Sequence, residues 1–257
     1  MEDRNMQNIV RKDVLFMDFD GVICDSFQEC LESAYEVYFS LNRGGYRSSI
    51  DGDVVRRGAE IRPFVLSGED FYYIPYAIEN GYEISSQIEF DALKERMKSY
   101  HSQISREFYR IRDYKKLNDT SAWLSANKLY DGMKKYLPTL IEEWDFYIVT
   151  TKDDSSVIKI LSYNDIHLCH SRIKGKRVGK SKNAIINEIL ELSGKNKAYF
   201  IDDSIQNLTS IRNDGVECFL AEWGYIDRSS INMSGATRFK MLTLNQFFDL
   251  FLQGVEA

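Results

Sequence analysis

This sequence of 257 residues has few prolines and lacks linkers, repeats and long apolar stretches. Only three prolines occur, and the sequence contains no low-complexity linker and no internal repeat. No apolar stretch approaches the roughly 20 residues of a membrane-spanning helix, and the polar residues 1–5 argue against a signal peptide. We therefore expect no membrane association, and one large domain or a core with a smaller companion.

Paired cysteines and basic tracts are also missing. The four cysteines are widely spaced and form no C-x-x-C motif, which favours a reduced, cytoplasmic location. The net charge of −6 without a basic run argues against nucleic-acid binding. A hydrophobic content of 44% is sufficient for a real core. We expect a small-molecule partner for a monomer or homodimer.

The most informative segment is the apolar run from Val14, which ends at Asp18 and Asp20 and is followed by Gly21. A run of this type predicts a buried strand, and strand geometry places both carboxylates on the same side. One aspartate here would most often cap the next helix. Two like charges this close repel unless a cation lies between them or one takes a proton. The pair therefore suggests Mg²⁺, which prefers oxygen ligands.

Strands and helices alternate in the rest of the chain outside the middle block. Amphipathic spacing predicts helices over 26–41, 133–143, 155–163, 181–192 and 205–213, and a last helix capped by Thr243. Buried-strand runs lie at 146–151, 198–201 and 218–221, with a weak one at 171–173. Alternation of this kind predicts an α/β fold with a Rossmann-like parallel sheet and helices on both faces.

The middle block of the sequence differs from the rest in composition and in predicted secondary structure. Glycine and proline punctuate residues 42–86, which are dense in tyrosine and phenylalanine, and residues 87–117 form one long predicted helix before a short one at 121–128. No strong buried-strand run occurs here. The block therefore predicts a mainly helical insertion, starting just after the first strand and lying over the carboxyl edge of the sheet.

Three strong strands end in polar residues that a parallel sheet brings to one edge. These are Asp18 and Asp20, Thr150 and Thr151, and Asp202 and Asp203. A basic loop, Lys174–Lys180, precedes the helix at Ser181. Carboxylates for a metal, hydroxyls for hydrogen bonds and a lysine for negative charge can together hold and attack a phosphoryl group.

In order and spacing, the chain resembles the haloacid dehalogenase-like (HAD) hydrolase superfamily, in its phosphoglycolate-phosphatase-like branch. The segments that carry the resemblance are Asp18–Ser26, Val149–Lys152 and Asp202-Asp203, with Leu129–Gly132 and Trp223–Tyr225 for the branch. The resemblance implies a HAD-like core over 1–25 and 129–257, and an inserted helical cap of the C1 type over 26–128.

The resemblance also implies roles for individual residues. Asp18 would be the nucleophile that forms an aspartyl-phosphate, and Asp20 the general acid and base. Asp18, Asp20 through its main-chain carbonyl, and Asp203 would bind Mg²⁺, with Asp202 as a helper. Thr150 would hydrogen-bond the phosphoryl oxygens, and Thr151 would contact the substrate. Covalent catalysis of this kind splits the transfer into two steps.

The phosphate-site lysine is open among three residues. Lys180 fits best, because Lys180–Ile186 aligns with the lysine-proline segment that opens a helix in the family, although Ser181 replaces the proline. Lys176 and Lys174 are the rivals. A second departure is Asn207, where many relatives carry an acidic residue.

Two further groups of residues can be read in two ways. Arg56, Arg57 and Arg62 lie among aromatics in the predicted cap, where they are either solvated surface charges or anion ligands for the substrate. His167 and His170 have no partner pair of the kind that a zinc site needs, so we interpret them as structural.

The sequence thus predicts a Mg²⁺-dependent phosphatase of a small phosphorylated metabolite, such as a sugar phosphate or a phosphoglycolate-like acid. The second aspartate of the first motif argues against a dehalogenase, and no cap lysine stands out for a phosphonate hydrolase. A phosphomutase with the same intermediate, and a catalytically inactive binding or regulatory protein of the same fold, are the alternatives.

Overall fold

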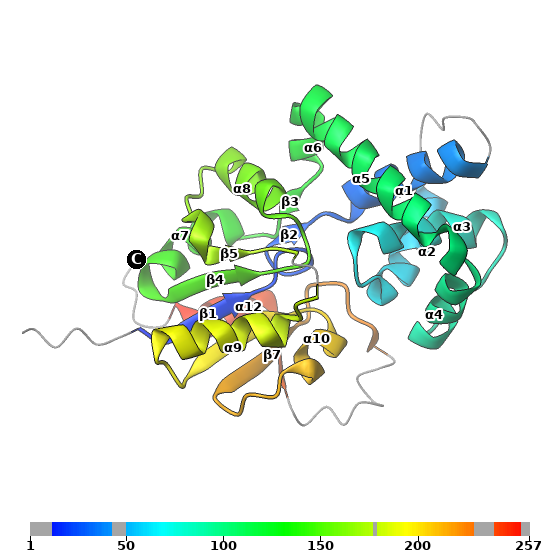
Figure 1. Cartoon of the computed structure of the whole chain (residues 1–257). Coiled ribbons are helices and arrows are strands. Elements are labelled where there is room, and N and C mark those ends of the chain that lie inside the picture. The colour runs from blue at the N-terminus through cyan, green and yellow to red at the C-terminus, as the bar shows by residue number, and fades with distance from the viewer. Residues whose placement is uncertain (1–11, 43–49, 177–178, 229–238, 253–257) are drawn as a thin grey trace, which may run out of the picture.

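The computed structural model of the protein describes residues 12–42, 50–176, 179–228 and 239–252 (Figure 1). Residues 177–178 of the predicted basic loop lie outside this part of the chain. No helix among the described residues is long and apolar enough to cross a membrane.

A six-stranded parallel sheet forms the centre of the molecule, in the order β5-β4-β1-β6-β7-β8. Its strands are β1 (Val14–Met17), β4 (Asp145–Val149), β5 (Ile173–Lys174), β6 (Ala198–Asp202), β7 (Val216–Ala221) and β8 (Lys240–Leu242). A separate antiparallel pair joins β2 (Cys24–Asp25) to β3 (Lys128–Leu129). The predicted Rossmann-like α/β fold is confirmed.

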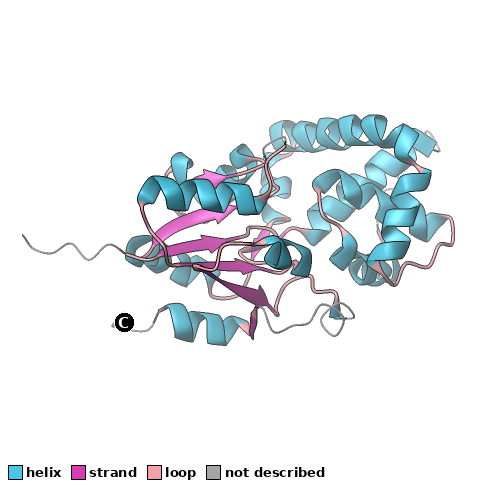
Figure 2. Ribbon diagram, turned by 60° about the horizontal axis from the view of Figure 1, so that its bottom comes forward, coloured by secondary structure: helices cyan, strands magenta, loops and turns pink. Residues whose placement is uncertain are grey.

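Both faces of the sheet are buried, as the unbroken apolar run of β1 predicts. Leu15 and Met17 pack into one hydrophobic cluster, while Val14 and Phe16 pack into another on the opposite face. Helices cover each cluster, so the sheet is the middle of three layers (Figure 2). Because the strands run in parallel, all of them present their carboxyl ends at one edge.

Eleven α-helices lie in the described part of the chain. They are α1 (Phe27–Asn42), α2 (Gly52–Ile61), α3 (Tyr73–Glu79), α4 (Gln87–Arg96), α5 (His101–Asn118), α6 (Thr120–Ser125), α7 (Met133–Glu143), α8 (Asp154–Tyr163), α9 (Lys182–Ser193), α10 (Ile205–Ser210) and α12 (Leu244–Phe251). Short 3₁₀ turns are η1 (Arg62–Phe64), η2 (Gly68–Tyr72), η3 (Lys98–Tyr100) and η4 (His170–Arg172).

The helices α1 to α5 form a separate body with its own hydrophobic cluster, here called the helical insert (residues 27–118). Large aromatic side chains such as Tyr35, Tyr72, Tyr73, Phe90 and Phe108 fill its centre. The insert lies beyond the carboxyl ends of the strands, whose arrowheads point toward it in Figure 2. The tyrosine-rich segment is therefore mainly core of the insert.

The single long helix predicted over 87–117 is wrong, because the chain bends at Met97 between α4 and α5. No glycine or proline marks the break. Phe90 of α4 and Phe108 of α5 are both fully buried in the insert's cluster, and the bend lets both helices face that cluster. Packing therefore overrides a continuous helical pattern.

Smaller differences occur near the core. The helix predicted over 205–213 ends at Ser210, since Ile211 turns to an extended conformation and is buried. Trp123 of α6 packs in the sheet cluster that contains Leu15 and Met17, rather than in the insert's cluster. The strands β2, β3 and β8 have two or three residues each, which is too short for an alternating apolar pattern to predict them from the sequence.

Candidate active site

Asp18 and Asp20 stand where β1 ends, as predicted. Asp18 is buried and is held by two backbone groups: its Oδ1 accepts from Phe19 N at 2.7 Å, and its own N donates to Ile201 O at 2.9 Å. Gly21 follows with a φ of +88°, and a Cβ there would come within 2.0 Å of Asp203 Oδ2. Gly21 is thus needed both for the turn and for the approach of Asp203.

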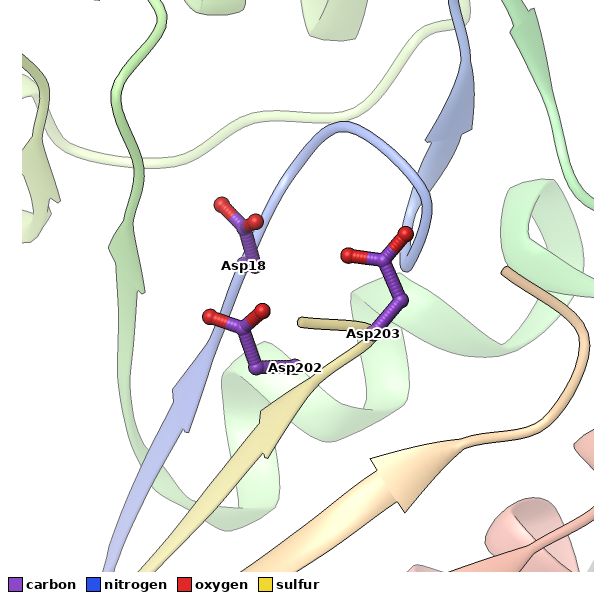
Figure 3. Close-up of side chains that lie close together, drawn as sticks. All are labelled: Asp18, Asp202 and Asp203. Carbon is purple, nitrogen blue, oxygen red and sulfur yellow. The ribbon is translucent and has the colours of Figure 1, made fainter. Parts of the chain in front are cut away.

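Asp202 and Asp203 stand at the end of β6, beside β1 in the sheet. The oxygens of Asp18, Asp202 and Asp203 lie within 4.8 Å of one another, and all three residues are buried (Figure 3). Burial raises the pKa of Asp18 to about 6, with Lys182 opposing and Asp202 adding to the rise. Burial and the charge of Asp202 raise the pKa of Asp203 to about 8.

This carboxylate cluster fits a hard divalent cation. Its donors are all oxygens, and like charges this close in a buried place repel unless a cation lies between them or one takes a proton. Asp202 is already engaged, because it accepts from Lys182 Nζ, Asn207 Nδ2 and Ser204 N. Among the described residues Asp203 has no ion-pair partner, and Asp18 shares Lys182 with Asp202, so Asp18 and Asp203 have more capacity left for a metal ion than Asp202 has.

The lysine in contact with these carboxylates is Lys182. Its Nζ lies 2.9 Å from Asp18 Oδ2 and 2.7 Å from Asp202 Oδ2, and the side chain is 7% exposed. Burial alone would lower the pKa of Lys182, but the two carboxylates outweigh it and raise the pKa. Ser181 caps α9 by accepting from Ala184 N, and Lys182 is the first residue of that helix.

The three lysines considered from the sequence lie elsewhere. Lys180 is exposed and pairs with Glu188 at 2.6 Å, so the expectation that it meets the carboxylates is corrected. Lys176 pairs with Glu69 of the insert, and Lys174 belongs to β5. A signal for Lys182 was present, because it precedes Ile185, Ile186 and Ile189 by three, four and seven residues on the buried face of α9.

Asp20 is held by two donors at the same oxygen. Ser26 Oγ donates to Asp20 Oδ1 at 2.6 Å, and Lys152 Nζ donates to it at 2.9 Å. Lys152 is buried; burial would lower its pKa, but Asp20 outweighs this and raises it. The sequence reasoning assigned no role to Lys152, although it directly follows the two threonines. The second oxygen of Asp20 is left for the adjoining pocket, which Asp20 lines.

Thr150 and Thr151 occupy the end of β4 with opposite exposures. Thr150 is buried, its N donates to Lys174 O at 3.0 Å, and its Oγ1 accepts from Lys152 N at 3.2 Å. Thr151 is exposed and lines the pocket. Both threonines thus reach the same sheet edge as the carboxylates.

Of the three arginines predicted as substrate ligands, only Arg62 lines the pocket over the carboxylates. Its guanidinium lies 3.9 Å from the ring centroid of Tyr225 and 5.0 Å from that of Phe71, and its buried Nε has no hydrogen-bond partner. Arg56 instead pairs with Asp53 and Glu60 on the exposed side of α2. Arg57 is half-buried on the same helix and does not line this pocket.

The other cations on the pocket wall already have partners. Arg112 donates to both oxygens of Glu29 at 3.1 and 2.9 Å, inside the insert. Lys176 Nζ lies 2.9 Å from Glu69 Oε1 and also donates to Tyr109 OH at 2.9 Å. Arg62 is therefore the lining cation that, in the described residues, keeps no carboxylate partner.

Tyr225 links Asp203, the connection to the insert and Arg62. Its N donates to Asp203 Oδ2 at 2.8 Å, and its hydroxyl donates to Asp25 Oδ1 and accepts from Phe27 N. Asp25 ends β2, and Phe27 begins α1. Tyr225 thus fixes the point where the chain leaves the sheet for the insert.

The histidines do not form a metal site in the described residues. His170 Nε2 lies 3.6 Å from Asp154 on the surface, and the one group of acids, cysteines or histidines there with metal-like spacing is the aspartate cluster.

Comparison with known proteins agrees with this architecture. Residues 69–221, more than half of the chain, match the haloacid dehalogenase-like hydrolase family. The chain belongs to that family. A comparison with curated proteins finds no match.

Solved structures share the fold at low identity. A haloacid dehalogenase-like hydrolase from Streptococcus pneumoniae superposes with a TM-score of 0.58 at 18% identity, over 93% of this chain and 97% of the other. A predicted phosphatase from Clostridium acetobutylicum superposes with a TM-score of 0.60 at 13% identity, over 95% of this chain and 99% of the other. A predicted phosphoglycolate phosphatase from Haemophilus somnus superposes with a TM-score of 0.59 at 15% identity, over 93% of this chain and 96% of the other.

Proposed function

We propose that the protein is a Mg²⁺-dependent phosphatase that hydrolyses a small phosphorylated metabolite through an aspartyl-phosphate. The observation that carries this proposal is the contact of Lys182 with Asp18 inside a buried cluster of three aspartates. A carboxylate in this setting, beside a cation and a metal-binding neighbour, can approach an anionic phosphoryl group that would otherwise repel it.

Asp18 is the proposed nucleophile. One of its oxygens attacks phosphorus, the bond to the ester oxygen breaks, and the leaving alcohol takes a proton from Asp20. Water then attacks phosphorus, Asp20 takes the water's proton, and phosphate leaves with Asp18 restored. Ser26 and Lys152 hold one oxygen of Asp20, which leaves the other to carry the proton.

Lys182 and Thr150 are proposed to bind the phosphoryl oxygens. Lys182 also keeps Asp18 ionised, and Asp202 keeps Lys182 in place through a 2.7 Å contact. Thr151 lines the pocket that Asp18 and Asp20 also line. Asp18, Asp203 and the main-chain carbonyl of Asp20 would hold Mg²⁺, which would supply further charge neutralisation of the phosphoryl group.

The helical insert is proposed to act as a cap. It supplies Arg62 to the pocket, and it closes the space over the sheet edge through Val65, Ser67 and Gly68. Exclusion of water by such a closure strengthens the electrostatic interactions inside.

The direct test is release of phosphate from p-nitrophenyl phosphate and from acetyl phosphate, with Mg²⁺ and with EDTA. We expect turnover that EDTA stops and Mg²⁺ restores. Asp18→Asn keeps the shape of the side chain but removes the nucleophile, so we expect loss of turnover with an unchanged circular dichroism spectrum. Full activity of this variant would overturn the proposed mechanism.

A further inference from the structure

The cavity directly over Asp18 is small. Its volume is about 80 Å³, and a single water occupies about 10–15 Å³ on this scale. A phosphoryl group together with a bound metal ion therefore takes up most of this space. The alcohol part of a substrate has to extend into an adjoining space.

A second, larger cleft adjoins this cavity between the helical insert and the sheet. Its volume is about 270 Å³. It shares five wall residues with the first cavity, so the two spaces lie next to each other: Pro63, Leu66, Asp203, Ser204 and Tyr225. Gln87 at the start of α4 closes one side, and Gln206 and Thr209 of α10 close the other.

The lining of this cleft contains no lysine and no arginine among the described residues. Its charged members are the carboxylates of Asp203 and Asp227, and its remaining polar members include the uncharged Gln87, Gln206 and Thr209. Pro63, Leu66, Ile205 and Tyr225 supply apolar surface. A second anionic group would find no cation in this lining to pair with, whereas an uncharged ring with hydroxyl or amide groups meets suitable partners.

The opposite side of the catalytic cavity does not provide an alternative anion site. Lys176 is bound to Glu69 and Tyr109, and the guanidinium of Arg112 donates to both oxygens of Glu29. An incoming carboxylate would have to displace these partners. Arg62, which has no carboxylate partner among the described residues, lines the catalytic cavity beside Asp203 and Tyr225, where it is available to the phosphoryl group rather than to the leaving group.

We propose that the cleft between Pro63, Leu66 and Gln87 of the insert and α10 of the core is the leaving-group subsite, and that it accepts an uncharged, ring-sized alcohol. This inference rests on the proposed phosphatase function and selects among its substrates. It favours phosphate esters of neutral sugars or aromatic alcohols over esters of small acids and over bisphosphates.

The test compares phenyl phosphate with 4-carboxyphenyl phosphate, which differ by one negative charge on the leaving group. Acetyl phosphate, whose small leaving group does not need the cleft, is the reference substrate. We expect a KM for 4-carboxyphenyl phosphate that is about tenfold or more above that for phenyl phosphate.

Two substitutions at Gln206, an exposed residue of α10, address the cleft itself. Gln206→Lys should bring the two KM values to within about twofold, because it places a cation in the wall. Gln206→Trp should raise the KM for phenyl phosphate and leave that for acetyl phosphate unchanged. Ser210→Lys and Ser210→Trp, at an exposed residue of the same helix outside the cleft lining, are the matched controls.

The outcomes separate the two proposals. Absence of hydrolysis of all three substrates overturns the phosphatase function and with it this inference. Hydrolysis with equal KM values for the two aryl phosphates, or a Gln206→Lys variant that behaves like Ser210→Lys, overturns the leaving-group subsite alone.

Discussion

Lys180 and Lys182 are two residues apart, but only Lys182 reaches the carboxylates. The difference arises because Ser181 caps α9, which leaves Lys180 outside the helix and turns Lys182 toward the buried face. Aligning the chain on the family's lysine motif led to Lys180, whereas the helical periodicity of the same segment leads to Lys182. Whether a lysine forms a buried ion pair depends on the face of the helix on which it lies, and the helical periodicity of the sequence predicts that face.

Lys182→Met should lower kcat by about 10²–10³-fold, the usual loss when one preorganised charge contact to a transition state is removed. Lys180→Met should change kcat by less than about twofold, because Lys180 pairs with Glu188 on the surface. Steady-state kinetics of both variants make the comparison, with thermal midpoints measured in parallel. Equal losses in the two variants would contradict the assignment of Lys182.

A second prediction at this scale concerns the ring of Tyr225, which stacks on Arg62. Tyr225→Leu removes the stacking and should raise KM by about 2–30-fold, the range that a cation–π contact of about 0.5–2 kcal/mol gives. Tyr225→Phe keeps the ring and loses only the hydroxyl contacts with Asp25 and Phe27, so its KM should stay closer to that of the parent. If Arg62→Met and Tyr225→Leu give losses that simply add, the ring does not act through Arg62.

At the scale of elements, strands and their polar ends could be predicted from the sequence, and the geometry within the insert could not. The runs at β1, β4 and β6 are short, apolar and followed at once by polar residues, so both strand and site are readable locally. The bend at Met97 depends on Phe90 and Phe108 sharing one cluster, which is a contact between segments. Local pattern contains no information on such a contact.

The pairing of α1 with α5 is another such contact, and it leads to a prediction on pH. Glu29 of α1 and Arg112 of α5 are both buried and doubly hydrogen-bonded. Burial alone would raise the pKa of Glu29, but Arg112, with a smaller contribution from Lys152, outweighs it and lowers the pKa from 4.5 to about 2. The unfolded chain therefore takes up the proton first as the pH falls.

The stabilisation by Glu29 should accordingly be complete above pH 4.5 and be lost as the pH falls toward about 2. Glu29→Gln should lower the free energy of unfolding at pH 7 by about 3–5 kcal/mol, since it leaves Arg112 buried and unpaired. Urea unfolding of both proteins at several pH values should show the difference shrinking between pH 4.5 and 2. Glu107→Gln, which breaks the more exposed pair with Arg110, should cost less than about 1 kcal/mol.

At the scale of the whole molecule, the insertion point already indicates where the insert lies. The chain leaves the sheet directly after the carboxylates of β1, so the inserted segment starts at the carboxyl edge of the sheet. The insert lies beyond that edge (Figure 1). The contacts that hold it there were not predictable, because they join residues far apart in the chain. They include Lys116 of α5 with Asp153 and Ser156 at the start of α8, and Lys176 with Glu69 and Tyr109.

Lys176 had two possible roles in the sequence, as a phosphate ligand or as a residue of a basic loop. Lys176 lines the pocket that contains Asp18, and its ammonium lies 2.9 Å from Glu69 Oε1 of the insert, which favours a contact that holds the insert against the core. If that is its role, Lys176→Met and Glu69→Gln weaken the same closure. Each should raise KM by about fivefold, which corresponds to about 1 kcal/mol for a partly exposed ion pair.

The double variant distinguishes the two roles of Lys176. A shared contact is lost only once, so Lys176→Met combined with Glu69→Gln should be no worse than either change alone. If Lys176 bound the phosphoryl group instead, removal of the charge of Glu69 would free the ammonium, and Glu69→Gln would lower KM while Lys176→Met raised it. Lys98→Met, which breaks an exposed pair with Glu95 within the insert, should leave KM unchanged and serves as the control for loss of a surface lysine. The two roles of Lys176 predict opposite changes in KM for Glu69→Gln. This variant therefore decides whether Lys176 binds the phosphoryl group or holds the insert against the core.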